Sequence, residues 1–169
     1  MKLGFIGCGN MASAIIGGIL NKGLAQPEDI CASVKTQSSA QKIQNTLGIS
    51  CTTDNLEVAK TADYLFLAVK PQFCTDVALQ IKDVLTDKQV IISVIAGKNL
   101  EWLKEHLGND KKIIRTMPNT PALVGEGVTG VCPDNLTSDE DLQNVLTLLR
   151  SFGQADIVTE PILDIVGAV

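Results

Sequence analysis

The chain has 169 residues, of which 45% are hydrophobic and 20% are charged. This composition is typical of a globular protein, and the length allows one domain, or one domain and part of a second. The net charge of −5, without a cluster of Lys and Arg, argues against nucleic acid or an anionic membrane as a partner. Glycines break the apolar run of the N-terminus almost at once, so no signal peptide is expected. The apolar stretch at residues 11–20 is about half as long as a membrane span, so no bilayer-crossing helix is expected.

The cysteines and the histidine are not spaced like the ligands of a metal site. No two cysteines form a CxxC pair, their number is odd, and the chain has one histidine. We therefore expect no metal and no disulfide framework, but reduced thiols in a cytoplasmic protein. These residues are Cys8, Cys31, Cys51, Cys74, Cys132 and His106.

Apolar runs of strand length alternate with segments of helical period along the first two thirds of the chain. The expected strands are residues 3–7, 30–34, 49–53, 64–69, 90–96 and 112–117. The expected helices are residues 10–22, 38–47, 55–60, 73–85 and 100–107. This alternation predicts an α/β fold, a doubly wound Rossmann-type sheet that is mostly parallel and has right-handed crossovers.

The pattern changes after residue 117. A loop rich in Pro, Gly and Thr is expected at residues 118–130, then a short apolar run at 130–132, a helix at 138–151 and a short strand at 156–159. Residues 1–160 are thus expected to form an NAD(P)-binding domain with extra short strands at its C-terminal end. Residues 161–169 begin an apolar helix without a partner, and we interpret them as the start of a missing second domain.

The first βα turn carries a G-x-G-x-x-A fingerprint at Gly7, Gly9 and Ala12. Gly7 allows the tight turn, Gly9 lets the backbone approach a pyrophosphate, and Ala12 lets the helix pack close to the strand. The free N–H groups at the start of the helix then face the anion. A strand before the motif and an apolar helix after it favour a dinucleotide site over an ordinary glycine-rich turn. Cys8 is interpreted as a small filler, although a helix N-terminus can lower a thiol pKa.

The end of the second strand indicates which cofactor binds. NAD-dependent proteins place an acid there to hold the ribose 2′-hydroxyl, but the nearest acid, Asp29, lies at the start of that strand. Ser33 and Thr36 can donate hydrogen bonds, and Lys35 can supply charge to a 2′-phosphate. The sequence therefore predicts a preference for NADP(H), with a solvated surface role for Lys35 as the alternative.

Three further segments follow strands, at the edge where doubly wound sheets bind ligands. They are residues 67–72, residues 93–97, and residues 115–127, which include Met117-Pro118-Asn119-Thr120-Pro121. Together with residues 4–12 they resemble pyrroline-5-carboxylate reductase over the length of the chain, from residue 2 to residue 169. The phosphate loop alone also resembles 3-hydroxyisobutyrate and 6-phosphogluconate dehydrogenases.

The resemblance implies a set of cofactor-binding residues. The phosphate loop would hold pyrophosphate, the second strand tip the adenosine ribose, and the later segments the cleft, the nicotinamide side and the reacting face. The implied residues are Ile6, Gly7, Gly9, Asn10, Met11, Ala12, Ser33, Lys35, Asn55, Ala68, Val69, Lys70, Pro71, Ala96, Gly97, Met117, Pro118 and Asn119. None is assigned to catalysis, since Lys70 is either a proton source or, as we favour, an electrostatic positioning residue.

The resemblance also implies an activity, the reduction of 1-pyrroline-5-carboxylate to L-proline with NAD(P)H, as the last step of proline biosynthesis. In that family a C-terminal helical domain supplies most substrate contacts and the dimer interface, so this chain is expected to bind NADP(H) but to be nearly inactive alone. The full-length protein is expected to be a homo-oligomer built on dimers. The alternatives are a non-catalytic NADP-binding module and a reductase of another substrate, of the β-hydroxyacid dehydrogenase or F420-dependent NADP reductase type.

Overall fold

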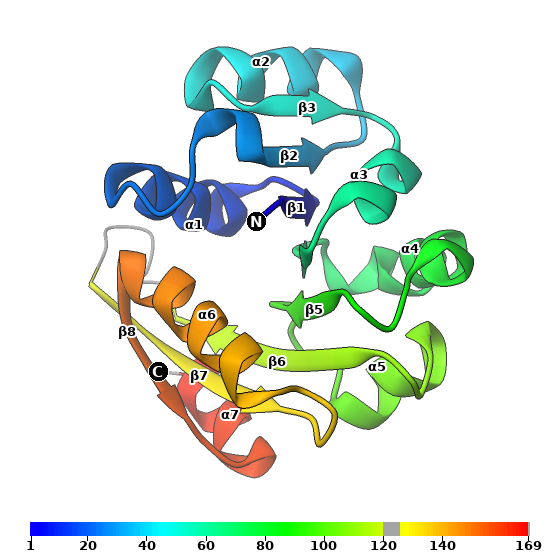
Figure 1. Cartoon of the computed structure of the whole chain (residues 1–169), viewed down its shortest axis with the longest axis vertical. Coiled ribbons are helices and arrows are strands. Elements are labelled where there is room, and N and C mark those ends of the chain that lie inside the picture. Colours follow the sequence, from blue (N-terminus) through cyan, green and yellow to red (C-terminus); the bar gives the residue numbers. More distant parts are fainter. Residues whose placement is uncertain (120–125, 169) are drawn as a thin grey trace.

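The computed structural model describes residues 1–119 and 126–168, with the side chains of 166–168 excepted. One eight-stranded sheet runs through the molecule in the order β3-β2-β1-β4-β5-β6-β7-β8, with helices on both of its faces (Figure 1). The strands are β1 (Leu3–Ile6), β2 (Ile30–Ser33), β3 (Ser50–Thr52), β4 (Tyr64–Leu67), β5 (Val90–Ser93), β6 (Lys112–Pro118), β7 (Gly127–Pro133) and β8 (Gly153–Ile157). The helices are α1 (Asn10–Asn21), α2 (Gln37–Leu47), α3 (Asn55–Thr61), α4 (Cys74–Ile81), α5 (Leu100–Leu107), α6 (Asp139–Leu149) and α7 (Glu160–Ala168).

The predicted doubly wound fold is confirmed. Strands β1 to β6 are all parallel, and the order reverses between β1 and β4, where consecutive crossovers go to opposite sides. In open α/β sheets, ligands bind outside the carboxyl ends of the strands at such a switch point. The topology therefore selects the edge near Ile6 and Leu67 before any side chain is considered.

The last strands differ from the prediction. Strand β7 spans Gly127–Pro133 and runs antiparallel to β6, whereas the sequence indicated only a short apolar run at 130–132. Strand β8 pairs parallel to β7 and covers Gly153–Ile157, so the expected strand at 156–159 was placed three residues too late. Glycines lower the strand propensity of both segments, and pairing on the sheet overrides that local signal. Residues 120–125 of the expected loop lie outside the described residues.

Two smaller boundaries also differ. The expected helix at 73–85 is helix α4 with a 3-10 turn on either side, η2 (Pro71–Phe73) and η3 (Lys82–Val84). Two further 3-10 turns are η1 (Pro27–Asp29) and η5 (Arg150–Phe152). Strand β5 ends at Ser93 rather than at residue 96, so residues 94–99 form the loop that leads into α5.

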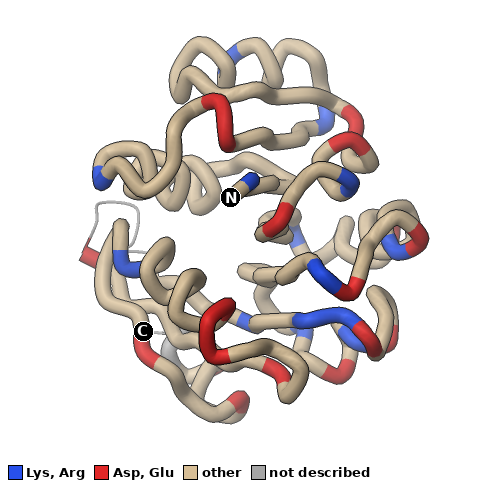
Figure 2. The backbone as a smooth tube through the Cα atoms, in the orientation of Figure 1, with Lys and Arg blue, Asp and Glu red and all other residues tan. Residues whose placement is uncertain are grey.

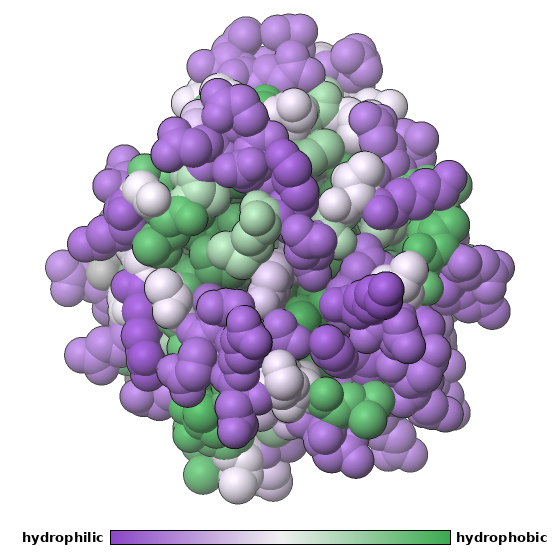
Figure 3. Space-filling view, viewed as in Figure 1, coloured by the Kyte–Doolittle hydropathy of each residue, from purple (hydrophilic) through white to green (hydrophobic). Residues whose placement is uncertain are grey.

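The hydrophobic core has two layers, one on each face of the sheet. One layer contains Phe5 and Phe66, whose rings stack with centroids 4.5 Å apart, together with apolar side chains of α1 and α6. The other contains Ile6 and Leu65 against α3, α4 and α5. On the face drawn in Figure 3, polar residues cover most of the surface, with hydrophobic patches beside α1 and toward the lower end of the view. Within the described ranges, every helix is too short or too polar to cross a bilayer.

Candidate functional site

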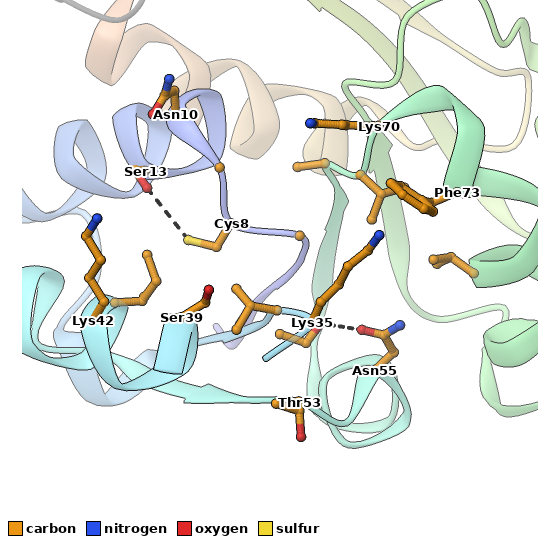
Figure 4. Close-up of a pocket in the computed structure, with 18 of the residues that line it drawn as sticks. Cys8, Asn10, Ser13, Lys35, Ser39, Lys42, Thr53, Asn55, Lys70 and Phe73 are labelled. Atoms are coloured by element: carbon orange, nitrogen blue, oxygen red, sulfur yellow. Dashed lines mark hydrogen bonds between the residues drawn. The ribbon is translucent and has the colours of Figure 1, made fainter. Parts of the chain in front are cut away.

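A cavity of about 790 Å³ lies at the carboxyl ends of β1, β2 and β4, where the strand order reverses. Its walls come from the loop between β1 and α1, the second strand tip, one face of α2, and the segment after β4 (Figure 4). Nine of the residues implied by the sequence line it together: Gly7, Gly9, Asn10, Ser33, Lys35, Asn55, Ala68, Val69 and Lys70. The predicted phosphate loop and the predicted ribose end therefore belong to one site.

Glycine suits the two positions of the phosphate loop for different structural reasons. Gly7 has a φ of +89°, and a Cβ there would lie 2.6 Å from the carbonyl oxygen of Ala68, so no other residue fits without a shift. Gly9 precedes α1 with ordinary backbone angles, and a Cβ there would meet nothing within 4 Å. The space in front of Gly9 is therefore open on the cavity side, as close approach of a pyrophosphate requires.

The start of α1 is left without oxygen partners from side chains. Gly9 offers no side-chain cap, and the first turn of α1 contains no acidic residue. Helix N-termini carry unpaired N–H groups and a partial positive charge, which together favour an anion. Because this end of α1 opens on the cavity, the cavity can bind a phosphate group through backbone N–H groups.

Cys8 lies between the two glycines and behaves as a neutral thiol. Its Sγ atom is 3.8 Å from the hydroxyl oxygen of Ser13, and the two are drawn joined in Figure 4. Burial raises the pKa of Cys8, and the hydrogen bond with Ser13 lowers it by less. The lowered pKa that a helix N-terminus can give a thiol is therefore not found at Cys8, because desolvation of the thiolate has the larger effect.

A chain of hydrogen bonds fixes the ribose end of the cavity. The hydroxyl of Ser33, which is fully buried, donates to Oδ1 of Asn55 at 2.6 Å. The amide nitrogen of Asn55 donates in turn to Oε1 of Gln80 at 3.0 Å. Since Ser33 uses its only proton on Asn55, it presents acceptor lone pairs rather than a donor to the cavity. Asn55 keeps one amide proton for a further partner.

Two lysines stand on opposite walls of the cavity (Figure 4). Lys35 extends from the second strand tip toward the ring of Phe73, with its Nζ atom 2.8 Å from the ring centroid (Figure 4). Lys42 rises from α2 on another wall. Both ammonium groups can attract a phosphate, and the aromatic ring holds Lys35 by a cation–π contact.

The contribution of α2 was not found in the sequence. The helix was predicted, but its cavity face was not, although the spacing of 3, 1, 3 and 1 along this face is helical. The further lining residues that sequence reasoning did not assign to the site are Ser13, Val34, Ser39, Lys42, Ile43, Thr46, Leu47, Thr53, Phe73 and Val77. The residues of α2 among them are those from Ser39 to Leu47.

Five implied residues lie farther along the same edge of the sheet, outside this cavity lining. Ala96 and Gly97 are exposed in the loop after β5, and Met117, Pro118 and Asn119 end β6 or follow it. Since β4, β5 and β6 are parallel neighbours, their carboxyl ends stand side by side next to the cavity. The amide oxygen of Asn119 accepts a hydrogen bond from the N–H of Val128 at 3.0 Å. Thr120 and Pro121, which belong to the same motif, lie outside the described residues.

The remaining implied residues flank the cavity without lining it. Ile6 is fully buried in the core beneath the loop, and Ala12 is 1% exposed against the core, where only a small side chain lets α1 pack closely. Met11 packs against the same core layer. Pro71 begins the turn η2, and Lys70 before it is extended with a ψ of 147°.

The residues present fit a dinucleotide. The cavity offers a glycine-lined helix N-terminus for the pyrophosphate, together with two lysines and apolar walls. Among the described residues, no group of three or more His, Cys, Asp or Glu side chains is arranged to hold a metal ion.

Sequence comparison agrees with this geometry. A family model described as "NADP oxidoreductase coenzyme F420-dependent" matches residues 2–97, more than half of the 169 residues. The chain belongs to this family. The matched part contains the phosphate loop, the second strand tip and the segment after β4, which are the walls of the cavity.

The chain is also similar to pyrroline-5-carboxylate reductases, which confirms the resemblance predicted from the sequence. It is 41% identical to the protein of that name from Escherichia coli K12 over 96% of this chain and 60% of the relative. It is 36% identical to the one from Methanosarcina acetivorans over 98% of this chain and 61% of the relative. The chain thus spans about 60% of the length of these curated relatives.

Solved structures give the same answer. The crystal structure of Plasmodium falciparum pyrroline carboxylate reductase with NADP bound superposes with a TM-score of 0.89 at 33% identity, covering 99% of this chain and 61% of that chain. A prephenate dehydrogenase from A. aeolicus superposes with a TM-score of 0.80 at 16% identity, over 100% of this chain and 64% of that chain. At this identity the second likeness shows only that the two chains share a Rossmann-like fold.

Proposed function

We propose that this chain is the cofactor-binding part of an NADPH-dependent reductase that converts 1-pyrroline-5-carboxylate to L-proline, in the last step of proline biosynthesis. The observation that carries the proposal is the cavity, in which the uncapped start of α1 and two lysines stand at the switch point of the sheet. The name and the bound NADP of the similar proteins support it.

In this proposal each part of the cavity has its own role in binding the cofactor. When bound, the nicotinamide cofactor supplies a hydride for the C=N bond. Gly9 and the first N–H groups of α1 bind the pyrophosphate, while Lys35 and Lys42 balance the charge of a 2′-phosphate. Ser33 holds Asn55 in one orientation toward the ribose. Lys70, extended at the cleft, positions the cofactor electrostatically.

A titration with NADPH and with NADH tests the cofactor assignment. NADPH should bind about tenfold more tightly, since each lysine near the 2′-phosphate adds a charge interaction. The double substitution Lys35→Gln with Lys42→Gln should remove this preference and leave NADH binding unchanged. Lys60→Gln, on an exposed part of α3 away from the cavity lining, is the matched control. Tighter binding of NADH to the wild type would contradict the assignment.

We further propose that residues 161–169 begin a helical domain that completes the substrate site and forms a homodimer, from which larger oligomers are built. The structure starts α7 at Glu160 and leaves Ile162 and Ile165 45% and 64% exposed, which supports a partner for that face. The 169-residue chain should then show almost no turnover of 1-pyrroline-5-carboxylate in a spectrophotometric assay. Turnover close to that of a full-length relative would contradict this part of the proposal.

A cytoplasmic location is proposed together with this activity. All five cysteines are free thiols in the structure, although the fold leaves three of them only partly buried. Unpaired thiols are typical of proteins that work in a reducing compartment. The biosynthetic activity of the named relatives supports the same location.

A second candidate is a reductase that exchanges hydride between NADP and coenzyme F420, which the description of the matched family favours. The same cavity would then hold NADP, and the substrate alone would differ. Assays of the longer protein with 1-pyrroline-5-carboxylate and with reduced F420, both with NADP(H), separate the two candidates.

A further inference from the structure

Arg115 is a buried cation that the proposed cofactor site does not use. It lies in β6, opposite Ser93 of β5 and Cys132 of β7, and is 2% exposed. Its guanidinium bonds two acids of α7, Glu160 at 3.1 Å and Asp164 at 2.6 Å. Its Nε atom is buried without a hydrogen-bond partner among the described residues. A buried guanidinium is costly unless it is paired, so these two carboxylates fix α7 against the sheet.

Glu160 has a second contact that Asp164 lacks. Its Oε2 atom, which accepts from Arg115, also accepts the backbone N–H of Leu100 at 2.7 Å. Leu100 is the first residue of α5, directly after the loop of residues 94–99. One carboxylate oxygen therefore joins a buried arginine of the sheet to the end of this loop.

The beginning of the same loop is also fixed. The hydroxyl of Ser93 accepts the N–H of Ile95 at 3.2 Å, and the hydroxyl of Thr116 donates to the carbonyl oxygen of Ser93 at 2.9 Å. Between the two anchors, Ala96 and Gly97 are exposed at the carboxyl edge of the sheet. The position of these two residues is therefore set by Ser93 on one side and by Glu160 on the other.

We propose that Arg115 and Glu160 form a tether that positions the loop of residues 94–99 against the nicotinamide end of the cofactor. The proposal rests on the proposed function, and on the family resemblance, which implies that Ala96 and Gly97 lie at that end. Arg115 acts as a positioning residue, because it touches neither the cavity nor the loop and works through the Glu160 carboxylate. Asp164 neutralises the same guanidinium without holding the loop.

The matched pair Glu160→Ala and Asp164→Ala tests the tether. Each variant removes one carboxylate of α7 from Arg115, but only the first releases the N–H of Leu100. Binding is measured with NADPH and with adenosine 2′,5′-bisphosphate, a probe that has the ribose and phosphate end but no nicotinamide. Glu160→Ala should weaken NADPH binding about fivefold and change binding of the bisphosphate less than about twofold, whereas Asp164→Ala should change neither by more than about twofold.

Two further measurements keep the test decisive. Glu160→Gln retains an oxygen that can accept from Leu100, so NADPH binding and slow hydrogen exchange at the Leu100 amide should return toward the wild type. Arg115→Met, checked for folding by circular dichroism, should act like Glu160→Ala. Equal effects of the two alanine variants on NADPH, or equal loss of both ligands, would overturn the tether. A wild type that binds neither ligand would instead overturn the proposed function.

Discussion

Helices α1 and α6 begin in opposite ways. The N-cap of α6 is Ser138, whose hydroxyl accepts the N–H of Asp141 at 3.1 Å, and three acids stand in its first turn. The N-cap of α1 is Gly9, without a side-chain capping hydrogen bond and without an acid in the first turn. Figure 2 shows the contrast as a red first turn in α6 and an α1 without charged residues. One helix start is satisfied by the chain itself, and the other is left for an anion from outside.

The two helix starts also lie at opposite edges of the sheet. Asp141 of α6 bonds Lys112 at 3.1 Å and the hydroxyl of Tyr64 at 3.0 Å, and these are the first residues of β6 and β4. The start of α1 lies at the carboxyl ends of the strands instead. At the amino ends of the strands, the chain's own side chains satisfy the start of α6. The cavity lies at the carboxyl ends of the strands.

The largest effect is expected from adding a side chain in the tight turn before α1. Gly7→Ala should cost about 3 kcal/mol of unfolding free energy, because the new Cβ adds overpacking against Ala68 to a positive φ. Gly23→Ala, with a φ of +67° and no atom within 4 Å of the new Cβ, is the control and should cost about 1 kcal/mol. Urea unfolding measures both, and equal losses would show that the close approach to Ala68 is unimportant.

Making the start of α1 resemble that of α6 should have the next largest effect. Gly9→Asp adds a capping carboxylate in open space, so the unfolding free energy should stay level or rise by a few tenths of a kcal/mol. NADPH affinity should fall about 100-fold, since the new charge faces the pyrophosphate. The isosteric Gly9→Asn separates charge from size and should bind NADPH clearly better than Gly9→Asp. Unchanged NADPH affinity in Gly9→Asp would contradict the assignment of this helix start.

Removing the N-cap side chain of α6 should change the unfolding free energy but not the binding of the cofactor. Ser138→Ala removes the hydroxyl that accepts from Asp141 and should cost about 1 kcal/mol. NADPH affinity should stay the same, because Ser138 does not line the cavity. Thermal unfolding and a cofactor titration on the same preparation check this. A weaker affinity would mean that the two edges of the sheet are coupled.

The smallest expected effect is the loss of the stabilising contribution of Asp141 at low pH. Burial tends to raise the pKa of Asp141, but hydrogen bonds from Lys112 and Tyr64 outweigh it, so the pKa is lowered. A lowered folded-state pKa stabilises the fold above the unfolded pKa and loses this contribution as the pH falls. The stability difference between wild type and Asp141→Asn should therefore narrow below about pH 4. A difference that stays constant from pH 7 to pH 3 would rule out this linkage.

The part of the fold that the sequence predicted well is the part with strong local signals. Strands β1, β4 and β5 are buried along their whole length, so their continuous apolar runs were visible. Strand β7 was missed because Gly127 and Gly130 lie in a segment that becomes a strand through pairing with β6 and β8. Local propensity cannot report such pairing.

In the site, too, the features with local sequence signals were predicted and those that depend on tertiary packing were not. The phosphate loop was predicted because the spacing of Gly7 and Gly9 reflects local requirements of the backbone. The cavity face of α2 depends instead on how that helix packs, with Ala40 as its one buried residue. The Arg115 tether joins residues 45 positions apart in the sequence. The spacing of Glu160 and Asp164 puts both acids on one helix face, but the sequence does not indicate that Arg115 is their partner.

The two ends of the sheet also differ, and this affects how the protein behaves at high concentration. A free strand edge can pair with another molecule and start aggregation. Strand β3 ends one side with only three residues, while β8 ends the other, within the described part of the chain, with five. Ile157 of β8 is 54% exposed, but exposed Asp156 puts a carboxylate beside it. A charged residue on an edge strand disfavours edge-to-edge pairing of one domain with the next, so Asp156→Ala should make the protein more prone to associate at high concentration.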